Sequence, residues 1–284
     1  MLRSAKLSAQ EIERLRETLE ERGIAASAPT NKYETLRVQF ENIFLIAYSS
    51  GKLVYEDNPQ TLKIISGVMQ SARSEYEYEL GSDEAGKGEW YGPLVVACVA
   101  VRPFDIGELR RAGVKDSKTL SAGTIKIIAN EIRQNKKLAW SHVVLSPPDY
   151  NEQFARLKKE GKNLNDMLAR AHARVIGETL EKLGNLDDAK ILVTIDEFDK
   201  KKMGDGLKGL EKAKGVAIVQ KTGGEEEMPV AAASILAKSF FEQEVDRLSS
   251  EFKVELKTAS PQDIPKKDLH RVAKTHFRNV SGLL

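Results

Sequence analysis

An apolar run at residues 93–101 (PLVVACVAV) constrains the fold of this chain more than any other stretch. A run with no polar alternation predicts a strand that is covered on both faces. The stretch before it, residues 76–80 (YEYEL), alternates polar and apolar residues and predicts a second strand, ending at Asp83. A glycine-containing turn, residues 84–88 (EAGKG), separates the two. We therefore expect a hairpin with the adjacent acids Asp83 and Glu84 at its mouth.

The N-terminal residues have the pattern of a small α+β module. Ser8 and Glu11 form a capping-box pair in front of a helix that ends near Gly23. Alternating or apolar stretches then predict strands, and a short helix follows them. The polar stretch 71–75 (SARSE) is the best domain boundary, which gives domains of residues 1–75 and 76–284. The expected elements after the first helix are strands at 33–40, 43–48 and 53–55 and a helix at 61–69.

The second domain alternates helices and strands after the central hairpin. Ser121 is placed to cap a helix, and Pro147 with Pro148 ends a strand. A later apolar strand ends at Asp196, and Pro229 opens a long helix. The expected elements are helices at 121–133, 163–183, 229–248 and, more weakly, 266–278, with strands at 138–145 and 191–195.

Composition excludes several classes of protein. The apolar run at 93–101 is far too short to cross a bilayer, and the first residues lack the apolar core of a secretion signal. Cys98 is the only cysteine, so no intramolecular disulfide can form and a reducing cytoplasm fits. Net charge is +2, but lysines concentrate in residues 200–221 and basic residues in 253–284. Such segments form either a phosphate-binding surface or a solvated loop.

Three acids follow apolar strands. If the strands ending at Asp83 and Asp196 are neighbours, Asp83, Glu84 and Asp196 converge, and they cannot all stay ionised unaided. Hard divalent cations resolve that repulsion, and two Mg²⁺ or Mn²⁺ ions together can hydrolyse a phosphodiester. An isolated Asp-Glu pair is more often a solvated loop. Glu197 and Asp199 compete with Asp196, although the apolar strand leads directly into Asp196.

A fourth acid is expected among Glu225, Glu226 and Glu227, directly before the helix that Pro229 opens. The helix dipole favours negative charge there in any case. The turn of Gly86, Lys87 and Gly88 leaves backbone N–H groups uncovered, and such a turn can lie against a sugar-phosphate strand.

Together these segments resemble the type 2 ribonuclease H family, in particular its HIII group. The resemblance spans roughly residues 78–280, and its motifs occur in the family's order. They are GSDEAGKGEWYGPL (81–94), VKDSKTLS (114–121), YNE (150–152), NLNDMLARAHA (163–173), ILVTIDEF (191–198), VAAASILAK (230–238) and AKTHF (273–277). Residues 1–75 are similar to the TATA-box-binding-protein-like domain through which HIII enzymes bind substrate.

The resemblance implies an α/β fold of the RNase H type, a mixed sheet flanked by helices. It also implies endonucleolytic cleavage of the RNA strand of RNA–DNA hybrids, leaving 5′-phosphate and 3′-hydroxyl ends. By position, Asp83, Glu84, Asp196 and Glu225 would be catalytic ligands of Mg²⁺ or Mn²⁺. Glu225 is preferred to Glu226 because residues 223–227 (GGEEE) resemble a one-residue insertion.

Substrate contacts follow from the same motifs. Gly86, Lys87 and Gly88 would contact ribose 2′-hydroxyls, the group that distinguishes RNA from DNA. Ser117 and Lys118 would approach the phosphates. The expected partner is an RNA–DNA hybrid, with no membrane, and we expect a cytoplasmic monomer.

Some alternatives remain open at this level. The chain could incise at single ribonucleotides embedded in duplex DNA, as HII enzymes do, or bind hybrids without catalysis. His172 lies within a predicted helix near its apolar side, where a supporting role is favoured over a metal ligand or general base. Trp90 and Tyr91 could stack on the substrate or cover the edge of the hairpin.

Overall fold

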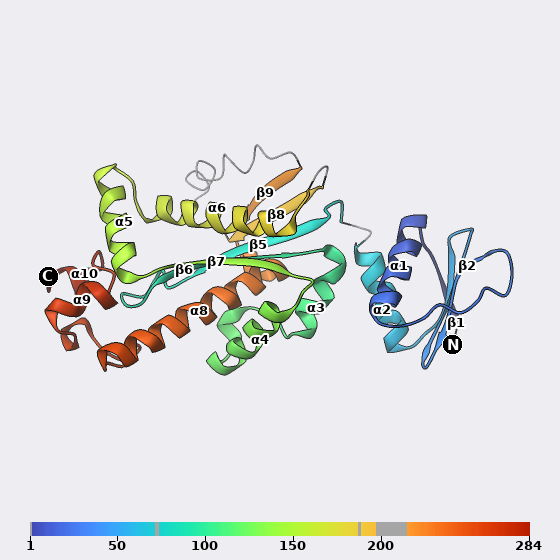
Figure 1. The fold of residues 1–284 in the computed structure, drawn as a ribbon, viewed down its shortest axis with the longest axis horizontal. Coiled ribbons are helices and arrows are strands. Elements are labelled where there is room, and N and C mark those ends of the chain that lie inside the picture. Colours follow the sequence, from blue (N-terminus) through green and yellow to red (C-terminus); the bar gives the residue numbers. More distant parts are fainter. Residues whose placement is uncertain (1, 72–73, 187–188, 197–214) are drawn as a thin grey trace. The chain divides into compact units, whose positions relative to one another are not determined.

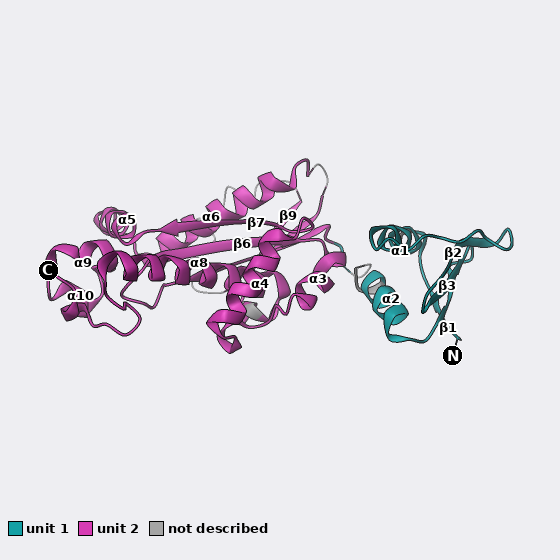
Figure 2. Cartoon of the chain, turned by 60° about the horizontal axis from the view of Figure 1, so that its bottom comes forward, with its two compact units in different colours: residues 1–75 teal, residues 76–284 magenta. Residues whose placement is uncertain are grey.

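The computed structural model describes residues 2–71, 74–186, 189–196 and 215–284. By its internal contacts the chain forms two compact units, residues 1–75 and 76–284 (Figure 2). No helix among the described residues is both long and apolar enough to span a membrane.

The first unit is a four-stranded antiparallel sheet with two helices on one side (Figure 1). The strand order is β1-β4-β3-β2. Ser8 and Glu11 form the predicted capping box at the start of α1, and Leu15 and Leu19 of that helix are buried. The elements are β1 (Leu2–Lys6), α1 (Ala9–Glu21), β2 (Glu34–Phe40), β3 (Ile43–Tyr48), β4 (Lys52–Glu56) and α2 (Pro59–Ser71).

The second unit is built on a five-stranded mixed sheet of order β7-β6-β5-β8-β9. The strands are β5 (Tyr78–Ala85), β6 (Leu94–Val101), β7 (Ala139–Leu145), β8 (Ile191–Asp196) and β9 (Val216–Lys221). β5 and β6 form the predicted antiparallel hairpin, and every residue of β6 is buried. β8 runs parallel to β5, and β9 runs parallel to β8. The strand with the Asp83–Glu84 pair is therefore central, between β6 and β8.

Helices cover both faces of this sheet (Figure 1). Helix α6 packs on one face, and α8 packs on the other together with α4. The helices of this unit are α3 (Ile106–Arg111), α4 (Ala122–Gln134), α5 (Pro147–Lys159), α6 (Leu164–Leu183), α8 (Met228–Phe252), α9 (Lys266–Val272) and α10 (Arg278–Ser281).

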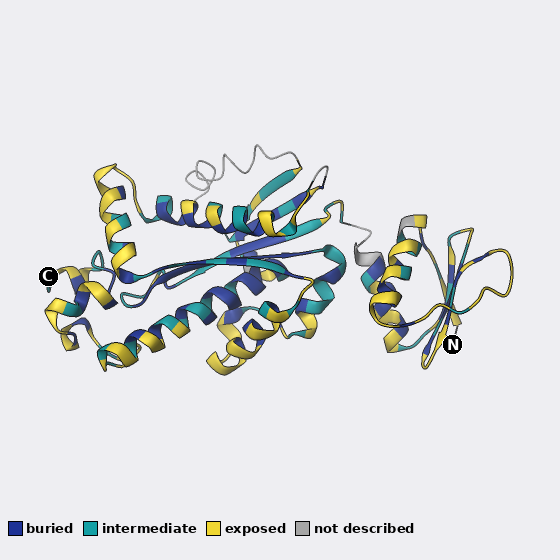
Figure 3. Cartoon of the chain, viewed as in Figure 1, coloured by how far each residue is buried: buried dark blue, intermediate teal, exposed yellow. Residues whose placement is uncertain are grey.

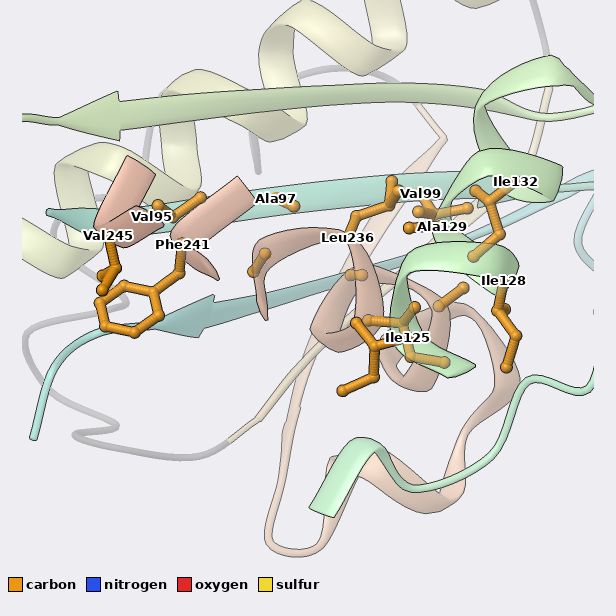
Figure 4. Packing of buried hydrophobic residues seen from close by; sticks show 14 of the residues in the cluster. Val95, Ala97, Val99, Ile125, Ile128, Ala129, Ile132, Leu236, Phe241 and Val245 are labelled. Atoms are coloured by element: carbon orange, nitrogen blue, oxygen red, sulfur yellow. The ribbon is translucent and has the colours of Figure 1, made fainter. Parts of the chain in front are cut away.

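A hydrophobic core lies on each side of the sheet, because β6 is apolar on both faces. Val95, Ala97 and Val99 point toward α8 and α4, where Leu236 and Ile125 meet them (Figure 4). Val96, Cys98 and Ala100 point toward α6. The buried residues accordingly follow the sheet and the inner faces of both helix layers (Figure 3).

Several elements differ from the sequence predictions, among them the following three. Pro147 and Pro148 do end a strand, but they also open α5, with Ser146 as its N-cap, because proline fits the first turn of a helix. β9 was not predicted, and its residues are only partly buried or exposed. β5 continues past Asp83 to Ala85.

Candidate active site

The parallel pairing of β5 and β8 brings acids from distant parts of the chain together. Ser82 pairs with Ile195, and the next residues along the two strands are Asp83 and Asp196. Both line a pocket of about 350 Å³ that Glu84 also lines. Lysines contribute to the same pocket. They are Lys87, Lys118 and Lys238.

Side chains alternate between the two faces of a strand, and that of Asp83 is on the face toward α8. Its carboxylate accepts a hydrogen bond from Ser234 of that helix and one from the Glu84 backbone N–H, 2.8 Å away. The Ser234 hydroxyl lies 2.9 Å from that of Ser117. Burial raises the pKa of Asp83 to about 7, and repulsion by Glu84 and Asp196 adds to the effect. Asp83 is therefore an acid whose ionised form needs a nearby positive charge.

Glu84 points to the opposite face, toward α6. Its Oε2 lies 3.3 Å from His172 Nε2, and its Oε1 lies 3.3 Å from Lys87 Nζ. Burial on its own raises the pKa of Glu84, but the hydrogen bonds from His172 and Lys87 outweigh it, so the pKa lies below its ordinary value. Glu84 is thus held as a carboxylate.

Asp196 is fixed by a glycine at the start of the 3-10 turn η3 (Gly224–Glu226). The Gly224 N–H donates to Asp196 Oδ1 at 2.9 Å, and a Cβ at residue 224 would lie 3.1 Å from Asp196 Cα. The predicted fourth acid, Glu225, follows directly in this turn. Its side chain, like residues Glu197 and Asp199, lies outside the described part of the structure.

The predicted substrate-contacting residues all line the same pocket. Gly86, Lys87 and Gly88 do so from the turn after β5, and Ser117 and Lys118 from the 3-10 turn η2 (Ser117–Thr119). Gly86 has φ +86° and no room for a Cβ, which would lie 2.2 Å from the Pro93 carbonyl oxygen. This backbone therefore requires glycine.

Lys274 holds this turn in place. The sequence analysis did not predict this role. None of the surface of Lys274 is exposed, and its Nζ donates to the carbonyls of Glu89 at 3.0 Å and Tyr91 at 2.9 Å. Its backbone N–H donates to the Trp90 carbonyl at 2.7 Å. The sequence motif at residues 273–277 includes Lys274. The motif did not indicate which part of the chain Lys274 contacts.

Trp90 and Tyr91 were expected either to stack on the substrate or to cover the edge of the hairpin. Both are partly buried against the core on the α8 side. The Tyr91 ring centroid lies 6.2 Å from that of Phe241. Ser234 and Lys238 are further pocket residues that the sequence did not single out. Both belong to α8, whose start was predicted from Pro229.

The donor set suits a hard divalent cation. In the described ranges no three His, Cys, Asp or Glu side chains are already grouped as a metal site. Asp83, Glu84 and Asp196 nevertheless offer carboxylate oxygens around one pocket, the ligand type that Mg²⁺ and Mn²⁺ prefer. Burial and, to a lesser extent, repulsion by Glu84 and Asp196 raise the pKa of Asp83, and a cation between these groups would offset both effects.

Comparisons with known proteins agree on one family. A family model described as Ribonuclease HII matches residues 80–277. The chain is 29% identical to Ribonuclease HIII of Protochlamydia amoebophila (strain UWE25), over 96% of this chain and 93% of the relative. It is 30% identical to Ribonuclease HIII of Chlamydia pneumoniae, over 95% of this chain and 93% of the relative.

Solved structures give the same result. Bst-RNase HIII in complex with Mn²⁺ matches with a TM-score of 0.61 and 25% identity, over 100% of this chain and 98% of that one. The fold is also shared with Aquifex aeolicus RNase H3, with a TM-score of 0.56 and 21% identity, over 97% and 100% of the two chains. The predicted fold class, a mixed sheet flanked by helices, is confirmed.

Proposed function

Because this chain belongs to the ribonuclease HII family and is related to ribonucleases HIII along nearly its whole length, we propose that it cleaves the RNA strand of RNA–DNA hybrids to 5′-phosphate and 3′-hydroxyl ends. The enzyme is a ribonuclease H, a hydrolase. The observation that carries the finer proposal is the meeting of Asp83, Glu84 and Asp196 in one pocket that also contains lysines. A protein that only binds nucleic acid gains nothing from clustered acids that repel the phosphates.

Four carboxylates would hold the metal: Asp83, Glu84, Asp196 and Glu225. Paired Mg²⁺ or Mn²⁺ ions, when bound, supply a nucleophilic water at neutral pH and stabilise the leaving oxygen of the phosphodiester. The related Bst-RNase HIII was crystallised in complex with Mn²⁺, which supports a divalent ion here.

Other residues of the pocket would orient the hybrid. Lys118 and Lys238 offer ammonium groups to phosphates, and Ser117 offers a hydroxyl from the same side. The Gly86–Gly88 turn would bring backbone N–H groups close to the ribose, where contact with a 2′-hydroxyl selects RNA. The first unit would add affinity for the hybrid, as a separate binding module. We expect the enzyme to act as a monomer in the cytoplasm.

Substitution of Asp83 tests the proposal, because Asn keeps the shape of Asp and removes its charge. With a labelled RNA–DNA hybrid and Mg²⁺ or Mn²⁺, we expect Asp83→Asn to lower cleavage by more than about 100-fold and to leave hybrid binding intact. Wild-type protein that binds the hybrid without cutting it in either metal would instead be a hybrid-binding module.

The same assay distinguishes HIII-like from HII-like activity. A duplex DNA with one embedded ribonucleotide is compared with a continuous hybrid of equal length. We expect the continuous hybrid to be cut faster; preference for the single ribonucleotide would contradict the proposal.

Glu225 is the fourth carboxylate of this proposal, and its neighbours are matched controls. We expect Glu225→Gln to lower turnover about tenfold or more, whereas Glu226→Gln and Glu227→Gln keep most of the activity. Glu227 already forms an ion pair with Lys221, which occupies its carboxylate. Equal and small effects at all three positions would exclude Glu225 as a ligand.

A further inference from the structure

His172 is a polar residue on the buried face of a helix. It lies in α6 between the buried side chains of Leu168, Val175 and Ile176, and none of its own surface is exposed. An imidazole in such surroundings is unfavourable unless its ring nitrogens are hydrogen bonded. Its Nδ1 lies 2.8 Å from Ser82 Oγ, and its Nε2 lies 3.3 Å from Glu84 Oε2. Both nitrogens therefore contact β5.

The neighbours of the ring indicate that Nε2, the nitrogen facing Glu84, carries a hydrogen. Ser82 Oγ carries one hydrogen and has two neighbours, His172 Nδ1 and the Ala97 carbonyl oxygen at 2.9 Å. If the hydroxyl donates to Nδ1, the neutral ring carries its hydrogen on Nε2. If it donates to Ala97, Nδ1 donates to Ser82, and the neutral ring then turns the lone pair of Nε2 toward the carboxylate, which is unfavourable. The favourable arrangement of the neutral ring therefore places its hydrogen on Nε2, directed at Glu84.

The spacing of the strand makes this contact rigid. Ser82 and Glu84 are two residues apart on β5, so their side chains emerge on the same face and one ring can reach both. The backbone of β5 is held on both sides, by β6 and β8. The ring is therefore anchored at Ser82 and directs Glu84 from a fixed position.

We infer that His172 is a positioning residue, which occupies Glu84 Oε2 and so leaves Oε1 directed at a divalent cation in the pocket. Oε1 already lies 3.3 Å from the Lys87 ammonium, a pocket-lining cation. This inference rests on the proposed function, because it assigns Glu84 to metal binding. Groups that orient a metal ligand in this way typically change metal affinity by about 10- to 100-fold.

Two conservative variants separate the two contacts of the ring. The amide of Gln reaches the position of Nε2 and can still donate to Glu84, whereas the amide of Asn reaches that of Nδ1 and serves only Ser82. We expect His172→Asn to weaken Mn²⁺ binding at least about tenfold and His172→Gln to restore most of it, as measured by isothermal titration calorimetry of the full chain. With the hybrid, the Asn variant should lose kcat and keep KM.

A matched control comes from the same face of the same helix. Thr179 is buried in α6 and donates to the Val175 carbonyl, away from Glu84. Thr179→Val perturbs the packing of α6 on the sheet and should leave Mn²⁺ affinity unchanged. Should His172→Asn fail to fold, Ser82→Ala tests the contact from its anchored end, and it should also weaken Mn²⁺ binding.

The outcomes distinguish this inference from the function on which it rests. If wild-type protein binds Mn²⁺ and cuts the hybrid, and the folded Asn and Gln variants bind Mn²⁺ equally tightly, the positioning role is wrong and the nuclease stands. If wild-type protein shows no Mn²⁺ binding that Asp83→Asn removes, the proposed metal site fails, and the role of His172 fails with it.

Discussion

Gly81 and Gly224 allow close backbone packing beside the acids of the candidate active site. A Cβ at residue 81 would lie 2.1 Å from backbone atoms of Pro229 and Val230. Because only hydrogen fits there, the start of α8 lies directly against β5, and one turn later the helix presents Ser234 to Asp83. Gly224 packs closely against Asp196, because a Cβ there would lie 3.1 Å from Asp196 Cα, and its N–H donates to the Asp196 carboxylate. Small residues thus determine where the acids lie.

Gly81→Ala should therefore separate α8 from β5. The added methyl group meets backbone atoms, which cannot rotate away, so we expect a loss of at least about 2 kcal/mol in the free energy of unfolding. Urea denaturation measures it. Gly107→Ala in α3 is the control, because a Cβ there has nothing within 4 Å. Equal stability of the two variants would contradict the close packing described here.

At this scale the sequence predicted the residues that end apolar strands and missed those that support them. Asp83 and Asp196 could be found because an apolar run leads into each. Ser234, Lys238 and Lys274 could not, since their role depends on which helix or segment packs on which face of the sheet. Periodicity shows that a helix has a buried side, but it does not show which element packs against that side.

Among the elements, the turn between β5 and β6 depends on a segment far along the chain. Lys274 holds the carbonyls of Glu89 and Tyr91, Gly92 donates to the Val272 carbonyl, and Tyr91 pairs with Ala273. Burial lowers the pKa of Lys274 to about 7, against a smaller opposing effect of Glu89. A neutral amine keeps two N–H groups, enough for both carbonyls.

Lys274 should make stability depend on pH. An unfolded chain keeps this proton up to about pH 10.5, and the folded chain releases it near pH 7, so stability rises with pH across that window. The slope is at most about 1.4 kcal/mol per pH unit. We expect Lys274→Met to flatten the wild-type increase in unfolding free energy between pH 7 and pH 9.

Lys266→Met, at an exposed position of α9, is the matched control and should leave that slope unchanged. Identical slopes in wild type and Lys274→Met would show that Lys274 keeps its proton in the folded protein throughout this range.

Elements with strong local signals were predicted well, and those without were not. Caps at Ser8 and Ser121 correctly placed the starts of α1 and α4. β1 was missed because its residues are almost all exposed and show no apolar alternation. α5 was missed because paired prolines were interpreted only as a break, although they also fit the first turn of a helix.

For the molecule as a whole, the site depends on a sheet with a core on each face. Strand alternation sends Asp83 toward α8 and Glu84 toward α6, so neighbouring acids are supported by different helix layers. Among the described residues, both hydrophobic clusters that support the acids consist of residues 78 and above, all within the second unit.

Deletion of residues 1–75 should separate binding from catalysis. We expect the hybrid dissociation constant to rise at least about tenfold, because a linked binding module is lost, while kcat falls much less. Equilibrium binding and single-turnover cleavage measure the two effects, and unchanged Mn²⁺ affinity is the control for an intact site. Unchanged hybrid affinity would remove the binding role proposed for the first unit.

The attachment of Lys274 to Glu89 has a consequence for synthesis of the protein. These residues are 185 positions apart in the chain. At ordinary translation rates the turn after β5 leaves the ribosome roughly 10–40 s before the lysine that fastens it. The sheet of the first unit lies wholly within Leu2–Glu56 and can form early. A nascent chain would thus acquire its first unit well before the turn beside its candidate active site is fastened.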